Sequence, residues 1–189
     1  MNIKKLIGFA IVVLILIQGC NKTSNNTLLQ EKGKAQATVL QLLQTIDSLG
    51  FLGEYDAVII KNYIAKAEEF GSNYPEDLTA AEYLYKAGLM AMTVAKSSDN
   101  PKETALYSQK ALLIFNDIQR IYPDFNGIRD CVINKAIIYE DILHDYENAE
   151  IYYREFIARY PTDTLAVNLE SYLPFLGKSA EEIMAEVEK

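Results

Sequence analysis

The chain has little of what catalytic and metal sites are built from. Its 189 residues include no tryptophan, one histidine and two cysteines. The single histidine, His144, cannot hold a zinc ion without several cysteines beside it. The G-x-S-x-G, H-E-x-x-H and P-loop patterns of common enzyme sites are missing too. The sequence therefore predicts no metal, no cofactor and no catalytic residue, and favours a binding protein over an enzyme.

Positive charge is also scarce. The chain carries 18 Lys and Arg against 26 Asp and Glu, a net charge of −8 at pH 7. An acidic protein is a poor partner for nucleic acid or for an anionic lipid surface. Half of the residues are hydrophobic and 13 are tyrosine, a composition typical of a packed globular domain.

The N-terminus has the pattern of an export signal. Lys4 and Lys5 precede residues 6–17, a run of 12 residues without a polar side chain. A helix needs about 20 apolar residues to cross a bilayer, so this run is too short to span one. A basic flank and a short apolar core are typical of a signal peptide.

The next four residues, Ile17-Gln18-Gly19-Cys20, resemble the lipobox of bacterial lipoproteins. Gln18 departs from the small or β-branched residue usual at that position. The resemblance implies that residues 1–19 are removed between Gly19 and Cys20, and that Cys20 carries palmitate-type acyl chains. Two such chains anchor a protein stably. An uncleaved N-terminal anchor, or an ordinary signal peptide cut elsewhere, is the alternative.

Residues 20–27 are predicted to be a lipidated, flexible tether, because residues 21–27 are all polar. Removal of the signal leaves 170 residues, and loss of its two lysines lowers the net charge to −10. Surface lipoproteins of some bacteria carry an acidic run directly after the cysteine, and this chain has none. We therefore expect a lipid-anchored outer-membrane protein that faces the periplasm, with exposure on the cell surface as the alternative.

The rest of the chain has a helical period. From residue 28, apolar residues recur at steps of three and four, and no stretch shows the strict alternation of a strand. Gly50 and Gly53 predict a turn, and Ser179 with Glu182 predicts a capping box that opens a last short helix. The predicted helices span residues 28–49, 54–72, 77–95, about 105–122, 126–143, 145–160, 163–176 and from 179 on. This predicts an all-α fold of about seven to eight helices.

One pattern occurs three times: an acidic residue, Phe or Ile, three residues, then Tyr-Pro. The copies, 48 and 38 residues apart, are Glu69-Phe70-x₃-Tyr74-Pro75, Asp117-Ile118-x₃-Tyr122-Pro123 and Glu155-Phe156-x₃-Tyr160-Pro161. Proline cannot continue a helix and biases the preceding residue away from it. Each copy therefore predicts a helix end, and the three together predict repeated units.

The last two units resemble tetratricopeptide repeats. Aromatic, alanine and proline positions of the second helix have the family's spacing at Tyr146, Ala149, Tyr153 and Pro161, and again at Ala111, Phe115 and Pro123, where Ser108 replaces the first aromatic residue. Small and aromatic positions of the first helix are matched by Gly88, and by Ala136 and Tyr139 if one residue is inserted near His144. The resemblance implies a solenoid of antiparallel helix hairpins. A non-repeating helical bundle is the alternative.

The predicted organisation is thus a repeat domain over 28–189. Its clearest repeats are 77–123 and 126–161, with a degenerate pair at 28–75 and capping helices at 163–188. Neighbouring hairpins stack because none buries its apolar face alone.

The resemblance implies a groove, lined by the first helix of each pair, that holds a peptide or protein. The groove candidates, all predicted to be exposed there, are Tyr83, Lys86, Asn134, Lys135 and Asp141. A lipobox with Tyr-Pro repeats resembles the repeat lipoprotein of the outer-membrane β-barrel assembly machine, which usually has about five repeats. We expect a scaffold for an envelope protein whose identity the sequence does not reveal.

The alternative function is capture of a glycan or nutrient at the cell surface. Surface glycan-binding lipoproteins also combine a lipobox with such helices, although they are several times longer, and the many tyrosines offer rings for sugar stacking.

Two further predictions concern single residues. Cys131, which has no disulfide partner once Cys20 is acylated, is expected in the core, with a reactive thiol as the alternative. His144 is expected to be an exposed turn residue.

Overall fold

The computed structural model describes the backbone of residues 3–187 and the side chains of residues 26–185. The described part is all-α, which confirms the predicted fold class. Its elements are α1 (Ile3–Phe51), α2 (Ala57–Asn73), α3 (Thr79–Ser97), α4 (Pro101–Ile121), α5 (Ile128–Ile137), the π-helical turn η1 (Ile138–Ile142), α6 (Tyr146–Arg159), α7 (Thr164–Tyr172), the 3₁₀ turn η2 (Leu173–Phe175) and α8 (Ala180–Val187).

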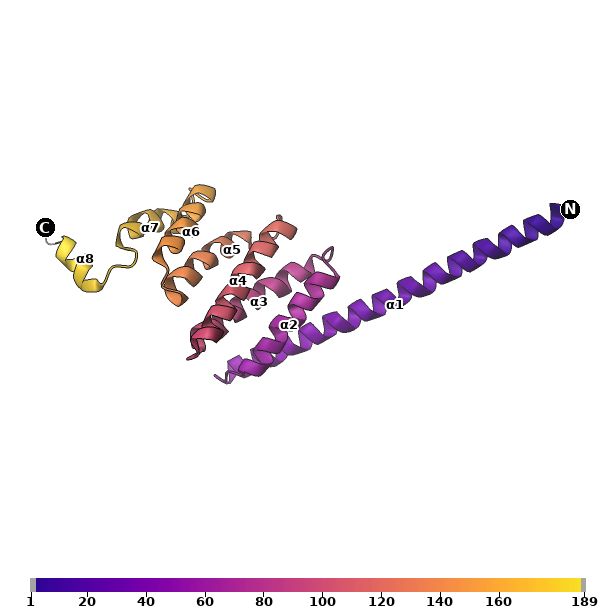
Figure 1. Cartoon of the computed structure of the whole chain (residues 1–189), viewed down its shortest axis with the longest axis horizontal. Helices are drawn as coiled ribbons and strands as arrows, with labels where there is room; N and C mark the ends of the chain where they lie inside the picture. The colour runs from indigo at the N-terminus through magenta and orange to yellow at the C-terminus, as the bar shows by residue number, and fades with distance from the viewer. Residues whose placement is uncertain (1–2, 188–189) are drawn as a thin grey trace.

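The helices follow one another in space in the order of the sequence. From α1 to α7, each helix packs against the next one along the chain, and the α3–α4 pair makes the most extensive contact. Figure 1 shows the resulting row, with the N-terminal part of α1 projecting from one end and α8 lying at the other. Two core clusters fill this row, one spanning α1 to α5 and the other spanning α5 to α7.

The N-terminal segment differs from its prediction. We expected a flexible tether over residues 20–27, but α1 is a single helix that runs through them to Phe51. No proline and no glycine lies between Cys20 and Gly33, so nothing there breaks a helix. The side chains of the predicted signal, residues 1–19, and of Cys20 lie outside the described residues. Within the part whose side chains are described, no helix has the length and apolarity needed to cross a membrane.

The helix ends follow the sequence signals. Gly53 has a φ of 73° in the turn after α1, a conformation that favours glycine. The Ser179 N–H donates to Glu182 at 2.7 Å and the Glu182 N–H donates to the Ser179 hydroxyl at 3.2 Å, which confirms the predicted capping box. At Gly88 the paired helices α3 and α4 approach so closely that a Cβ there would lie 2.6 Å from the Phe115 ring. The small position predicted at Gly88 thus coincides with a close approach of two helices.

The three Tyr-Pro sequences form the same backbone turn. Each tyrosine (Tyr74, Tyr122, Tyr160) ends its helix with φ between −134° and −123° and ψ between 55° and 61°. Each of their N–H groups donates to the carbonyl four residues earlier at 2.9 Å, on the buried Phe70, Ile118 or Phe156. The repeated sequence therefore specifies a repeated structure, the Tyr-Pro turn.

The residue two positions after each proline, here called the closing residue, contacts the first helix of its own pair. Two of the three closing residues are charged. Asp77 pairs with Lys32 of α1 at 2.8 Å. Asp163 pairs with Arg129 of α5 through two bonds of 2.5 and 3.0 Å. Ion pairs thus hold the first and third Tyr-Pro turns against the first helix of their own pair.

The second closing residue, Phe125, is apolar. Its ring lies 5.8 Å from the ring of Tyr85 on α3, measured between centroids. Gly127 leaves room for this ring, because a Cβ at Gly127 would clash with it. The middle turn is therefore held by ring packing.

Candidate functional site

Two of the five predicted groove residues are buried, so the prediction that they line an open groove is wrong for them. Tyr83 is 6% exposed, and its hydroxyl accepts a hydrogen bond from Gln36 of α1 at 3.2 Å. Lys135 is 4% exposed and donates to Asn116 of α4 at 3.2 Å. The neighbouring helices cover both positions, which the sequence of a single hairpin does not reveal.

Lys135 is held by an aromatic ring as well as by polar groups. Its ammonium lies 4.5 Å from the centroid of the Tyr152 ring and 3.8 Å from a carboxylate oxygen of Glu155. Burial lowers the pKa of Lys135, and the charge of Glu155 opposes that shift. This lysine is therefore part of the packing between α4, α5 and α6.

The other predicted groove residues reach the surface. Lys86 is exposed, Asn134 is half-buried, and Asp141 is exposed. Asp141 lies in η1 and forms an ion pair with Lys96, at the end of α3, with an N–O distance of 3.6 Å. The pair bridges the first helices of two successive hairpins, as the predicted groove requires.

A hollow of about 260 Å³ lies beside this ion pair, and we call it the inner groove. The side chains on its α3 wall are Leu89, Met92 and Thr93. Ile137 and Ile142 face them from α5 and η1. The inner groove is thus an apolar cleft with the Lys96–Asp141 pair at its edge.

A second hollow, of about 620 Å³, shares Lys96 and Asp141 with the inner groove. We call it the tyrosine hollow, because its aromatic lining residues are Tyr146, Tyr172 and Phe175. The shared ion pair makes the two hollows neighbours, so they form one continuous strip from α3 to the C-terminal segment.

Glu140 ties three elements together at the floor of the tyrosine hollow. Its carboxylate accepts hydrogen bonds from the hydroxyls of Tyr153 on α6 and Tyr172 on α7. Burial raises the pKa of both tyrosines, and the bond to Glu140 raises it further. Both phenols therefore stay protonated and keep donating, which fixes η1, α6 and α7 relative to one another.

The π turn accounts for a departure from the repeat spacing. The Leu143 N–H donates to the Ile138 carbonyl, five residues earlier, at 3.0 Å, so η1 holds one more residue than an α-helical turn. The sequence match required one inserted residue near His144, and η1 ends two residues before that position. π turns are often found at functional sites. His144 itself is exposed, as predicted, with a φ of 52°.

The predicted repeat-core residues have mixed outcomes. Ala111, Phe115, Ala136, Ala149 and Tyr153 are buried, whereas Tyr139 is half-buried and stacks on Tyr152 at 5.4 Å. The two prolines, Pro123 and Pro161, are exposed just beyond their helices.

Tyr146 is 41% exposed, so its predicted place in the core is wrong. It is the first residue of α6, and its ring lies against Gly177, where a Cβ would be 2.8 Å away. Cys131, in contrast, is fully buried, as predicted, and burial raises its pKa to about 12, with the charge of Asp130 adding to the shift. A thiol with so high a pKa is a poor nucleophile.

Glu140 and Tyr172 were not among the site residues predicted from the sequence. An α-helix turns about 100° per residue, so an extra residue in η1 changes the directions of the side chains within that turn from those of an α-helix. An α-helical projection consequently misplaces Glu140 relative to α6. The signal that pointed to this region was the one-residue mismatch in the repeat spacing.

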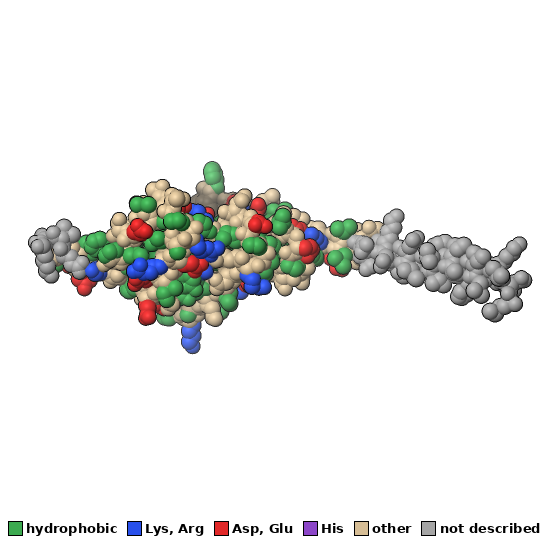
Figure 2. All heavy atoms as spheres, turned by 90° about the horizontal axis from the view of Figure 1, so that it is seen from above, with side chains coloured by type: hydrophobic (Ala, Val, Ile, Leu, Met, Phe, Trp, Pro, Cys, Tyr) green, Lys and Arg blue, Asp and Glu red, His purple; other side chains and the backbone are tan. Residues whose placement is uncertain are grey.

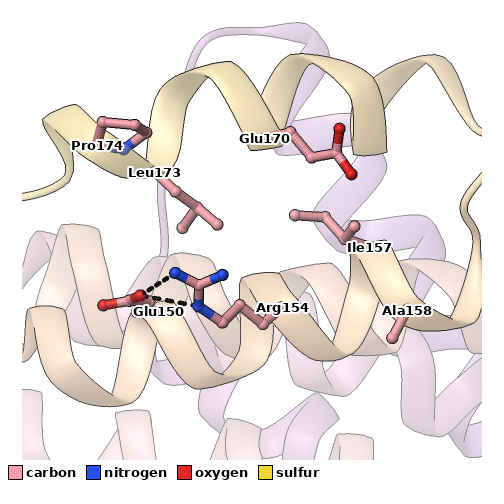
Figure 3. Close-up of a pocket in the computed structure, with 7 residues that line it drawn as sticks. All are labelled: Glu150, Arg154, Ile157, Ala158, Glu170, Leu173 and Pro174. Carbon is pink, nitrogen blue, oxygen red and sulfur yellow. Dashed lines mark hydrogen bonds and ion pairs between the residues drawn. The ribbon is translucent and has the colours of Figure 1, made fainter.

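A third hollow, of about 450 Å³, lies between α6 and α7 (Figure 3). Glu150 and Arg154 form an ion pair at 2.6 Å on its α6 side, and Leu173 approaches from η2.

Among the described side chains, no group of three or more His, Cys, Asp or Glu residues could hold a metal ion.

Figure 2 shows acidic and basic side chains interspersed over the helical body, without a large patch of one sign on that face. The fold and the strip of hollows define an all-α protein with an apolar cleft between its first helices. Comparisons of the chain with protein-family models, with curated proteins and with solved structures find no match.

Proposed function

We propose that this protein is a lipid-anchored scaffold of the bacterial envelope, whose helical-repeat domain holds a protein partner in the inner groove. The observation that supports this most directly is the position of the groove. It lies between the first helices of two successive hairpins, α3 and α5, where helical-repeat proteins hold peptides. The anchor is the acylated Cys20, and the domain faces the periplasm from the outer membrane.

The size and lining of the inner groove favour a protein segment. Small-molecule sites are typically about 300–1,000 Å³, and the inner groove, at about 260 Å³, is smaller. Its apolar walls suit one or two hydrophobic side chains that act as anchors in a larger interface. The Lys96–Asp141 pair at the edge offers a donor and an acceptor to the partner backbone.

A second candidate function rests on the tyrosine hollow. Tyr146 and Tyr172 are 41% and 37% exposed, and both line a space of about 620 Å³ together with Phe175. Partly exposed aromatic rings next to acidic side chains are suited to a sugar. This arrangement favours the alternative of a small glycan-binding lipoprotein.

Site-specific crosslinking in intact cells distinguishes the two functions. A photoreactive residue placed at Thr93, which is exposed beside the inner groove, is expected to capture a protein. The matched control is the same residue at Leu113, 57% exposed on α4. An adduct at Thr93 and none at Leu113 supports the scaffold. Absence of adducts at Thr93, together with glycan binding by the purified protein, contradicts it.

The lipid anchor has its own test. Cys20→Ser removes the thiol that carries the acyl chains, so we expect the protein to move from the membrane to the soluble fraction. Recovery of the variant in the membrane fraction would show that acylation is not the anchor. The crosslinking at Thr93 is independent of this result.

A further inference from the structure

A fourth hollow, of about 470 Å³, lies between the first two Tyr-Pro turns. Its lining includes Glu76, Leu78, Glu82, Ile121, Tyr122 and Asp124. We call this hollow the acidic turn groove. We infer that it is a second docking surface, which binds a protein segment with an arginine next to an aliphatic side chain.

The first observation is an unsatisfied buried hydroxyl. Tyr122 is 4% exposed, and its hydroxyl makes no hydrogen bond with any residue that the structure describes. Burial raises the pKa of Tyr122, and the nearby charges of Asp77 and Glu76 add to the shift. The hydroxyl is therefore protonated, and Glu76, one of the two acids whose charge acts on it, lines the same groove as Tyr122. A buried polar group without a partner is costly, and a ligand N–H would satisfy its oxygen.

The second observation is the charge of the rim. Glu76, Glu82 and Asp124 all line the groove and are exposed. Within the described part of the chain, Glu82 and Asp124 form no ion pair, and Glu76 lies 4.0 Å from the Lys32 ammonium, which is closer to Asp77. Three weakly compensated carboxylates around one hollow attract a cation.

The third observation is apolar surface beside the acids. Leu78 is 79% exposed and Ile121 is 37% exposed, and both line the groove. A ligand that covers them needs an aliphatic side chain next to its cationic one. Arginine fits better than lysine, because its planar guanidinium can bond to carboxylates and to the Tyr122 oxygen with separate N–H groups.

This surface is separate from the inner groove. Ala81 lines the acidic turn groove and Thr93 lines the inner groove. At a rise of ~1.5 Å per residue, they lie about 18 Å apart along α3. One partner can span both surfaces or two partners can bind at once, and either surface can be disproved without the other.

The test is a binding titration with a defined probe. The full-length protein in detergent micelles is titrated into a fluorescent peptide, acetyl-Gly-Ser-Leu-Arg-Leu-Ser-Gly-amide, and anisotropy reports the affinity. A peptide with Glu in place of Arg is the control. We expect the arginine peptide to bind at least about tenfold more tightly, and its affinity to fall as salt is raised.

Two groove variants and their matched controls locate the site. Tyr122→Phe is expected to weaken binding about fivefold, which is the worth of one hydrogen bond, without lowering the melting temperature. Its control is Ser108→Ala, which removes the other unpartnered buried hydroxyl, outside the groove. Glu82→Gln with Asp124→Asn is expected to weaken binding at least tenfold, whereas Glu54→Gln, at an exposed position in the turn before α2, leaves it unchanged.

Three results would overturn the inference. The first is equal affinity for the arginine and glutamate peptides, or no binding of either. The second is binding that neither groove variant weakens. The third is a lower melting temperature for Tyr122→Phe, because the hydroxyl would then have a partner within the protein.

Discussion

The first and third Tyr-Pro turns differ from the second in how they are held. Asp77 and Asp163 reach back to a cation on the first helix of their pair, whereas Phe125 reaches back to a ring. The backbone turn is the same in all three. The backbone turn is therefore specified by Tyr-Pro. The contact between the closing residue and the first helix varies from one pair to another.

The charged closures also have a second role that the aromatic one lacks. Asp77 accepts the Thr79 N–H at 2.9 Å, and Asp163 accepts the Leu165 N–H at 2.8 Å. Each carboxylate therefore satisfies a free N–H at the start of the next helix. Phe125 has no such acceptor, so α5, which begins at Ile128 after the N-cap residue Gly127, has no side-chain cap. The closing contact of the middle turn is therefore ring packing, without an ion pair or a helix cap.

Phe125→Ala is expected to cause the largest loss among the closing residues. The substitution removes the half-buried Phe125 ring that packs against Tyr85 and leaves a void beside Gly127. We therefore expect urea unfolding to show a free energy of unfolding lower by about 2–3 kcal/mol. Leu106→Ala, at a position 55% exposed on α4, is the control and should change little. A loss for Phe125→Ala as small as that of the control would contradict the aromatic closure.

Asp163→Asn is expected to have a smaller effect. Asparagine keeps the size and the cap, and loses only the ion pair with Arg129. Asp77→Asn should have a smaller effect still, because a bidentate Arg–carboxylate pair is stronger than a single Lys–carboxylate contact. Thermal melting of the two variants measures the order. If Asp77→Asn lowers the melting temperature more than Asp163→Asn, the assignment of the stronger closure to the third turn is wrong.

The smallest effect is a dependence of stability on pH. The hydrogen bond from Arg129 lowers the pKa of Asp163, with the Leu165 N–H adding to it, and the bond from Lys32 lowers that of Asp77, with Thr79 adding to it. A carboxyl whose pKa is lower in the folded state contributes its stability above the unfolded value of about 3.9. This contribution is lost as pH falls below that value and through the folded pKa.

Urea unfolding at a series of pH values between 7 and 2 measures this loss. The variant that combines Asp77→Asn with Asp163→Asn should lose less stability below pH 4 than the original chain. Equal losses in the two proteins would show that other carboxyls account for the acid sensitivity.

The helices and their ends were predictable, because they depend on local signals. Proline, glycine and the Ser179–Glu182 capping box lie in the sequence at the positions where helices end or begin. Burial was harder to predict where a distant element decides it. Lys135 looked like a surface residue on α5, yet Asn116 of α4 and Tyr152 of α6 enclose it.

The candidate site was predictable in place but not in detail. The sequence predicted a groove between first helices; of its five candidates Asp141 lines the inner groove, whereas Tyr83 and Lys135 are buried. It did not reveal the strip that continues past Glu140, because the extra residue in η1 changes which side chains face α6 and α7. A single-residue insertion is visible only as a mismatch in spacing, and its position within the turn is decided by packing.

Crosslinking of a groove variant is the sharpest test of partner binding in the inner groove. Met92→Glu places a charge on the apolar wall of the groove and is combined with the photoreactive residue at Thr93, in a protein whose melting temperature is shown to be unchanged. We expect the yield of the Thr93 adduct to fall at least about tenfold relative to the same protein with Met92. An adduct of undiminished yield would contradict partner binding in the inner groove.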